Sequence, residues 1–122
     1  MAAVLDSQIK SATGGRALTR LAGADRYTTA AQIARYCVSK EGFGTDVVYI
    51  ATGVVYPDAL AGGTLAGSLH KPLLLTQTDF CKPGTAAFLE QYKPSIMSIW
   101  LFGSTGAISE KGLKSIDDVM MR

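Results

Sequence analysis

Four short runs of aliphatic and β-branched residues are separated by longer stretches in which apolar side chains recur every three or four positions. The runs cover residues 17–21, 47–51, 73–76 and 96–102. The two middle runs lack polar alternation, which is typical of strands buried on both faces of a parallel sheet. Each run therefore predicts a strand.

A helical pattern follows each predicted strand. The first has apolar residues at i, i+3, i+4 and i+7 along 30–37, and Asp25 is placed to cap its N-terminus. The second covers 57–69, and its many Gly and Ala residues predict close packing against a sheet or another chain. The last two predicted helices cover 85–92 and 108–119.

A strand followed by a helix, four times over, predicts an α/β fold. We expect a mainly parallel sheet flanked by helices, in a Rossmann-like or flavodoxin-like layer architecture with right-handed crossovers. The length of 122 residues fits one domain. With 48% apolar and 18% charged residues, the chain can form a sizeable core, which excludes a disordered protein.

Two features bear on cellular location. The longest apolar runs are far shorter than the roughly 20 residues of a membrane helix, which excludes an integral membrane protein. The first residues lack the basic and then apolar order of a signal peptide. These features leave either a cytosolic protein or a piece of a larger one.

Residues 3–11 and 107–115 share one pattern: Ala, a β-branched residue, an acid at the fourth position, an aliphatic residue at the seventh, then Lys and Ser. Such self-similarity indicates repeated units. It predicts that residues 1–15 are the terminal helix of a preceding repeat and that residues 16–122 form one complete repeat. The alternative is that two amphipathic helices have converged on similar residues.

The net charge of +2 is too small to indicate a nucleic-acid binder, but the charge is unevenly distributed. Six basic residues lie between Lys10 and Lys40 and are opposed there by Asp25 alone, whereas the rest of the chain is net acidic. This stretch predicts either an anionic partner or a solvated helix face.

Metal and catalytic signals are weak. Cys37, Cys81 and the single His70 are too sparse for a zinc site, so free thiols are expected, with one disulfide as the alternative. Ser104 and Ser109 lack the context of a nucleophile elbow. We expect no catalytic residue, no bound metal and no cofactor.

Three segments follow the predicted strands and lead into helices: 23–29, 52–58 and 103–106. Ligands of open parallel sheets bind at such positions, where helix N-termini favour anions. No Walker loop and no GxGxxG motif is present. Asp25 and Asp58 are either a carboxylate pair or two helix caps, and Arg20, Arg26 and Asp25 are candidates for a buried ion network.

Four ordered motifs carry a resemblance to a known family. They are RLAGADRYTTA at 20–30, VYIATG with YPDAL at 48–53 and 56–60, KPLLLT at 71–76, and IWLFG with GAIS at 99–103 and 106–109. Together they resemble the second class of cell-wall-binding repeat, found in surface proteins of clostridia and related Gram-positive bacteria.

The resemblance implies a non-catalytic module, generally present in tandem copies, that holds a secreted protein to the cell wall without a covalent bond. The implied partners are an anionic, teichoic-acid-like wall polymer and neighbouring repeats packed about a pseudo-threefold axis, with no nucleic acid and no membrane contact. The implied location is the cell surface, with the signal peptide outside this sequence. A small doubly wound nucleotide- or phosphate-binding domain, with or without enzymatic activity, is the alternative.

Carried onto this sequence, the matching polar positions are candidate polymer-binding residues. We expect Arg20 and Arg26 to contact anions, Asp25 and Asp58 to orient loops or arginines, and Tyr27 to stack on a sugar ring. The full candidate set is Arg20, Asp25, Arg26, Tyr27, Thr29, Thr52 and Asp58.

The chain departs from the family pattern at two places. Val54 and Val55 stand where polar residues are usual, and Ser104 follows Gly103 where a second glycine is usual. If the two valines are exposed, they predict a contact between repeats, because clustered apolar surface marks interfaces.

Overall fold

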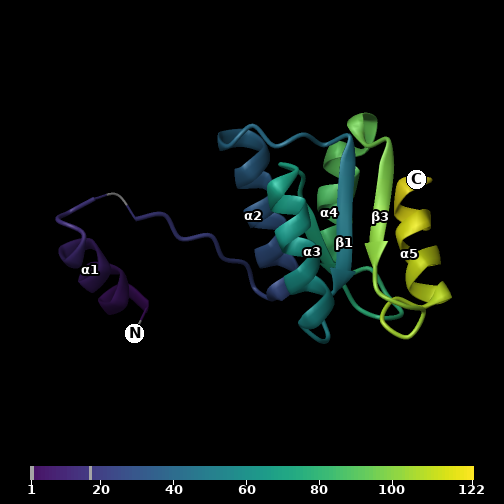
Figure 1. Cartoon of the computed structure of the whole chain (residues 1–122), viewed down its shortest axis with the longest axis horizontal. Coiled ribbons are helices and arrows are strands. Elements are labelled where there is room, and N and C mark those ends of the chain that lie inside the picture. Colours follow the sequence, from purple (N-terminus) through teal and green to yellow (C-terminus); the bar gives the residue numbers. More distant parts are fainter. Residues whose placement is uncertain (1, 17) are drawn as a thin grey trace.

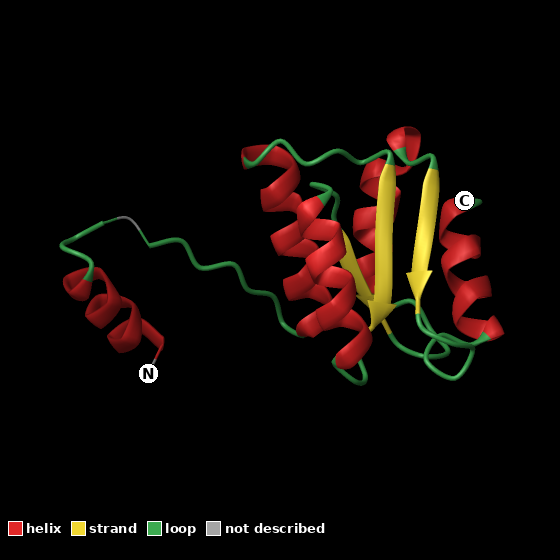
Figure 2. Ribbon diagram, in the orientation of Figure 1, coloured by secondary structure: helices red, strands yellow, loops and turns green. Residues whose placement is uncertain are grey.

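Three parallel strands form the central sheet of the protein (Figures 1 and 2). The computed structural model describes residues 2–16 and 18–122. The strands are β1 (Val47–Thr52), β2 (Leu73–Thr76) and β3 (Ser98–Phe102). β1 lies in the middle, in the order β2-β1-β3, with Tyr49 opposite Leu73 on one side and Trp100 on the other.

Helices cover both faces of this sheet (Figure 2). α3 packs on one face, α4 and α5 contact each other on the opposite face, and α2 packs against β2 and α4. The predicted α/β class with a parallel sheet is therefore confirmed. The helices are α1 (Ala2–Ala12), α2 (Arg26–Lys40), α3 (Pro57–Ser68), α4 (Pro83–Tyr92) and α5 (Glu110–Met120), with one 3₁₀ turn, η1 (Lys93–Ser95).

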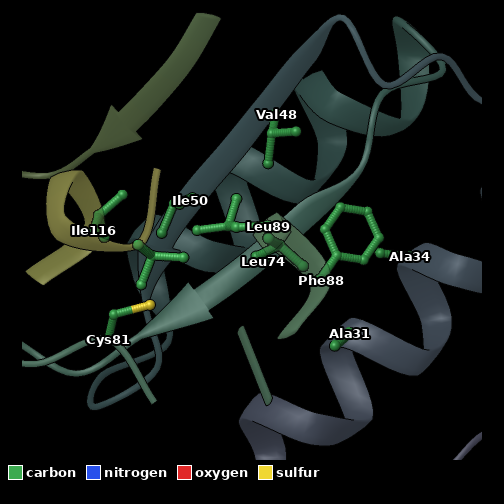
Figure 3. Packing of buried hydrophobic residues seen from close by; sticks show 10 residues of the cluster. Ala31, Ala34, Val48, Ile50, Leu74, Cys81, Phe88, Leu89 and Ile116 are labelled. Carbon is green, nitrogen blue, oxygen red and sulfur yellow. The ribbon is translucent and has the colours of Figure 1, made fainter. Parts of the chain in front are cut away.

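The main core lies between the sheet and the helices α2, α4 and α5 (Figure 3). Every second residue of β1 points into it, as the pleat requires, and Phe88 and Leu89 of α4 meet them. Its fully buried members include Val48, Ile50, Leu74, Phe88 and Leu89.

The small residues of α3 allow this helix to lie close to the other face of the sheet, as the composition predicts. Gly62 contacts the ring of Phe102, and a Cβ atom at this position would lie 2.8 Å from Cε2 of that ring. The Phe102 ring in turn stacks on Tyr49, with 5.2 Å between the ring centroids. A larger residue at position 62 would therefore push α3 away from the sheet.

The predicted strand at 17–21 is wrong for the residues that the structure describes. Residues 18–23 have no regular secondary structure, and Ala17 lies outside the described residues. The segment runs away from the sheet toward α1 (Figure 1), and α2 packs against β2. The apolar pattern alone therefore does not place this segment in the sheet.

Two predicted boundaries also shift. The run 96–102 begins too early, because Ile96 ends η1 and β3 begins at Ser98. Ile108 precedes α5 instead of lying in it, since Ser109 caps that helix by accepting a hydrogen bond from the Gly112 N–H at 3.2 Å. Among the described helices, none has the length and apolar character needed to cross a membrane.

Candidate functional site

The carboxyl ends of the three strands lie at one edge of the sheet, and the three predicted loops meet there. Nη1 of Arg26 donates a hydrogen bond to the carbonyl oxygen of Gly53, which joins 23–29 to 52–58. Asp58 lies against Gly103, where a Cβ atom would be 2.7 Å from Oδ2 of Asp58, and this contact joins 52–58 to 103–106. The loops therefore form one continuous surface at this edge.

A groove of about 590 Å³ opens on this surface. Arg26 contributes its charge, while exposed Val54, Val55 and Tyr56 form an apolar wall beside it. The Val-Val pair is exposed, as the repeat-contact prediction requires. The groove is lined by Arg26, Thr52, Gly53, Val54, Val55, Tyr56, Pro57, Ala59 and Leu75.

Asp25 caps α2, which confirms one of its two predicted roles. Its Oδ1 accepts hydrogen bonds from the Thr28 N–H at 2.7 Å and from the Thr28 hydroxyl at 2.8 Å. These bonds, the main-chain one first, hold the pKa of Asp25 below its usual range. The neighbouring Thr29 hydroxyl accepts a hydrogen bond from the Gly23 N–H at 2.9 Å, which fixes the chain before the cap.

Tyr27 and Thr52 are buried beneath the surface of the site. The Tyr27 side chain is 6% exposed and packs against Gly53, so the expectation that its ring stacks on a sugar is wrong. The Thr52 hydroxyl accepts a hydrogen bond from the Val54 N–H at 3.2 Å, which shapes the turn after β1. Both residues support the site from below.

Asp58 lies in the first turn of α3 without capping it. The N-cap position belongs to Tyr56, which makes no side-chain hydrogen bond to the helix. Among the contacts of the described residues, Asp25 binds Thr28 and Asp58 contacts Gly103, so the two carboxylates are held by different neighbours. The N-terminus of α3 consequently keeps main-chain N–H groups without a side-chain acceptor.

Arg20 lies apart from this edge, on the extended segment after α1. Its guanidinium group forms an ion pair with Asp6 of α1, which lowers the pKa of Asp6. The Arg20 side chain remains 53% exposed. The predicted buried network of Arg20, Arg26 and Asp25 is therefore wrong, since each side chain binds a different neighbour.

Lys82 is a member of the site that the sequence does not reveal. It precedes α4, and its ammonium nitrogen lies 5.7 Å from the centroid of the Tyr27 ring, within cation–π range. Gly84 packs on Thr28, where a Cβ atom would lie 2.8 Å from the Thr28 hydroxyl oxygen. The N-termini of α2 and α4 therefore touch, and Lys82 adds a second cation to this edge beside Tyr27 and Asp25. The Pro83-Gly84 pair marks a helix start but says nothing of this contact.

The remaining chemical candidates are dispersed. His70 is exposed in a loop with φ of 54°, and Cys37 and Cys81 are free thiols. Ser109 is occupied as a helix cap. Within residues 2–16 and 18–122, no cluster of His, Cys, Asp and Glu has the composition of a metal site.

Comparison with known proteins identifies the family of this chain. The model of the family described as Cell wall binding domain 2 (CWB2) matches residues 20–112. The chain belongs to the CWB2 family. The match spans the three strands, the helices between them and every candidate site residue. The family resemblance and the cell-wall-binding role are thereby confirmed.

Individual relatives of this CWB2 chain share its sequence or its fold. It is 34% identical over 93 residues to N-acetylmuramoyl-L-alanine amidase LytC of Bacillus subtilis (strain 168), covering 76% of this chain and 18% of the amidase. Cwp6 from Clostridium difficile shares the fold with a TM-score of 0.74 and 29% identity, over 93% of this chain and 17% of Cwp6. Cwp8 from the same organism, at 18% identity and a TM-score of 0.68, shows the fold alone over 93% of this chain and 18% of Cwp8. The chain thus spans only 17–18% of the length of these relatives.

Proposed function

We propose that this chain is a non-catalytic module that anchors a secreted protein to the cell wall by binding an anionic, teichoic-acid-like polymer. The observation that carries the proposal is the position of Arg26, which lines an open groove and is held there by the Gly53 carbonyl. A guanidinium group fixed in this way is suited to phosphate or carboxylate groups, because it needs little ordering when the anion arrives.

Helix ends strengthen the positive potential at this edge. α4 begins here without a side-chain cap and without an acidic residue in its first turn, so its main-chain N–H groups favour a negative ligand, whereas the first turn of α3 already carries Asp58. Lys82 stands at the start of α4. An extended polyanion lying along the edge would meet Arg26, Lys82 and the N-terminus of α4.

The candidate residues then divide by role. Arg26 is the principal polymer contact, Lys82 joins it, and exposed Arg20 is a secondary contact that competes with its ion pair to Asp6. The other predicted residues shape the surface from beneath or beside it, by capping, packing and turn hydrogen bonds. These supporting residues are Asp25, Tyr27, Thr29, Thr52 and Asp58.

Tandem copies are part of the proposal. α1 stands away from the sheet (Figure 1), which supports assigning residues 1–15 to a preceding repeat and 16–122 to one complete repeat; Met1 lies outside the described residues. Val54 and Val55 offer apolar surface for packing of neighbouring repeats about a pseudo-threefold axis. Several weak sites on one chain bind a polymer tightly through effective concentration.

Retention on purified Gram-positive walls tests the function. The chain, alone and as a concatenated array, is mixed with walls that carry or lack their anionic polymer. We expect retention that requires the polymer and weakens as salt rises. Arg26→Ala and Lys82→Ala should reduce it, whereas Arg16→Ala, an equal loss of charge at an exposed residue outside the groove, should leave most of it.

Three results would contradict the proposal. The first is equal retention on walls stripped of polymer. The second is equal loss in all three variants, which would indicate that only net charge matters. The third is displacement by a free nucleotide at concentrations that leave salt-sensitive binding intact, which would favour the nucleotide-binding alternative.

A further inference from the structure

The outer edge of β3 is open in the described part of the chain. β3 pairs with β1 on its inner side and is the last strand of the sheet. Met97 and Trp100 beside this edge are 86% and 59% exposed, although both are large apolar side chains. An edge strand with unpaired main-chain groups and exposed apolar neighbours is a template for another strand.

A hollow of about 150 Å³ accompanies this edge between β3 and α5. Leu113 on its rim is 50% exposed, although it lies on the packing helix of the unit. A fourth strand beside β3 would cover this hollow with one row of its side chains and Trp100 with the other. The hollow is lined by Ile99, Leu101, Leu113, Ile116, Asp117 and Met120.

Residues 18–21 carry a strand-like sequence pattern but have no regular secondary structure and no sheet partner among the described residues. Their sequence, Leu-Thr-Arg-Leu, is extended and exposed or half-buried, and none of its main-chain groups has a hydrogen-bond partner among those found for the described residues. The segment leads from the loop after α1 toward α2 (Figure 1), and the Arg20–Asp6 ion pair ties it to α1. In chain order, α1 and this segment correspond to the helix and second strand of a βαβ unit whose first strand is absent from the described residues.

β3 and α5 correspond to the first strand and the helix of such a βαβ unit, without its second strand. Residues 3–11 match residues 107–115, so α1 is the counterpart of α5, and the segment after α1 corresponds to whatever strand follows α5. α5 lies on the same face as α4. A right-handed crossover through α5 places the next parallel strand at the outer edge of β3.

We propose that residues 18–21 of a second copy of this chain add to the outer edge of β3 as a parallel fourth strand. The order becomes β2-β1-β3 followed by the segment of the neighbour. The contact is head-to-tail, since each copy gives its segment to one neighbour and receives one at β3. The inference rests on the repeat boundary proposed above, and in a tandem array the following repeat is the natural donor.

The direction of side chains in the added strand follows from the ion pair. Arg20 faces α1, the counterpart of α5, so Leu18 and Arg20 of the incoming strand face α5 and Leu18 enters the hollow. Thr19 and Leu21 then face the opposite side, where Leu21 covers Trp100. The residue matching Asp6 in the repeat is Glu110, which supplies a new partner for Arg20.

Trp100 is the single tryptophan of the chain, so its fluorescence reports this edge directly. With the full chain in solution and no wall material present, mass by analytical ultracentrifugation and Trp emission are followed from micromolar to millimolar concentration. We expect mass to rise and the emission to shift to shorter wavelength over the same range. Neighbouring residues of a strand turn their N–H groups to opposite sides, so proline at either Thr19 or Arg20 removes a ladder hydrogen bond. At least one of Thr19→Pro and Arg20→Pro should therefore abolish both changes, whereas Ala22→Pro, just outside the pairing segment, should keep both.

A chain that stays monomeric with constant emission would overturn strand addition. So would association without a Trp100 shift, or association that persists in both Thr19→Pro and Arg20→Pro. Because the assay contains no polymer, each of these results leaves wall retention to be decided separately, and a failure of retention leaves the strand contact standing.

Discussion

Arg26 Nη1 donates its hydrogen bond to the main-chain carbonyl of Gly53, so the first residue of α2 is tied to the residue that follows β1. The same glycine packs against Tyr27, with a Cβ atom at this position 2.8 Å from Cε1 of the ring. One arginine therefore has two tasks. It closes the edge of the domain and presents positive charge in the groove.

Two substitutions at position 26 distinguish the effect of the hydrogen bond from the effect of the charge. Arg26→Ala should lose about 1 kcal/mol of stability with the hydrogen bond, and wall retention with the charge. Arg26→Lys should lose a similar amount of stability, because the lysine ammonium group does not reach as far as Nη1 of arginine and so loses the bond to Gly53, but it should keep most retention at low salt. Urea unfolding and wall retention measured on the same preparations check both. Retention lost equally in Lys and Ala would contradict a charge-based role.

Two glycines of α3 should respond to alanine with opposite signs. Gly62→Ala forces a Cβ atom onto the Phe102 ring, which is itself stacked on Tyr49, so we expect a loss of about 1–3 kcal/mol. Gly67→Ala meets no atom within 4 Å and should gain up to about 1 kcal/mol from helix propensity. Thermal and urea unfolding of the two variants give the comparison. Equal effects would show that α3 is not packed tightly on the sheet.

The sequence was sufficient for the parts of the fold that depend on local pattern. The uniform apolar runs of β1 and β2 and the Asp25 cap of α2 are where the pattern places them. The strand predicted over residues 18–21 is absent for a physical reason. A pattern of apolar residues reports local strand propensity, whereas pairing with another strand depends on the tertiary arrangement of the chain.

The candidate site was likewise only partly predictable from the sequence. The position of Arg26 at the carboxyl edge follows from the order of strands and helices, and sequence reasoning finds it. The contact of Lys82 with Tyr27 joins residues far apart in the chain, and no local pattern encodes it. The burial of Tyr27 depends on Gly53 and on α4, so its role in packing was equally hidden.

The cap of α2 should make stability sensitive to acid. The pKa of Asp25 is lower in the folded chain than the ordinary value of 3.8, so its contribution is complete above that value and is lost as pH falls through the folded pKa. Asp25→Asn keeps an acceptor for the Thr28 N–H but does not titrate. The stability difference between the native chain and Asp25→Asn should therefore shrink as the pH drops below 3.8, in urea unfolding followed by circular dichroism. A constant difference would contradict the prediction.

Burial raises the pKa of the Cys81 thiol from 9.0 to about 11, and the side chain is 4% exposed within the core cluster. The thiol is therefore protonated at neutral pH, and an aromatic disulfide reagent should label partly exposed Cys37 first and Cys81 only upon unfolding. Because the folded chain holds the proton more tightly, the contribution of Cys81 to stability is complete below pH 9 and declines as the pH rises toward 11. Burial raises the pKa of half-buried Cys37 as well. Cys81→Ala should therefore lose the larger part of this alkaline decline, and Cys37→Ala, the matched removal of a thiol, the smaller part. Rapid labelling of both thiols in the folded chain, or the same alkaline slope in both variants, would show that Cys81 is not enclosed by the core.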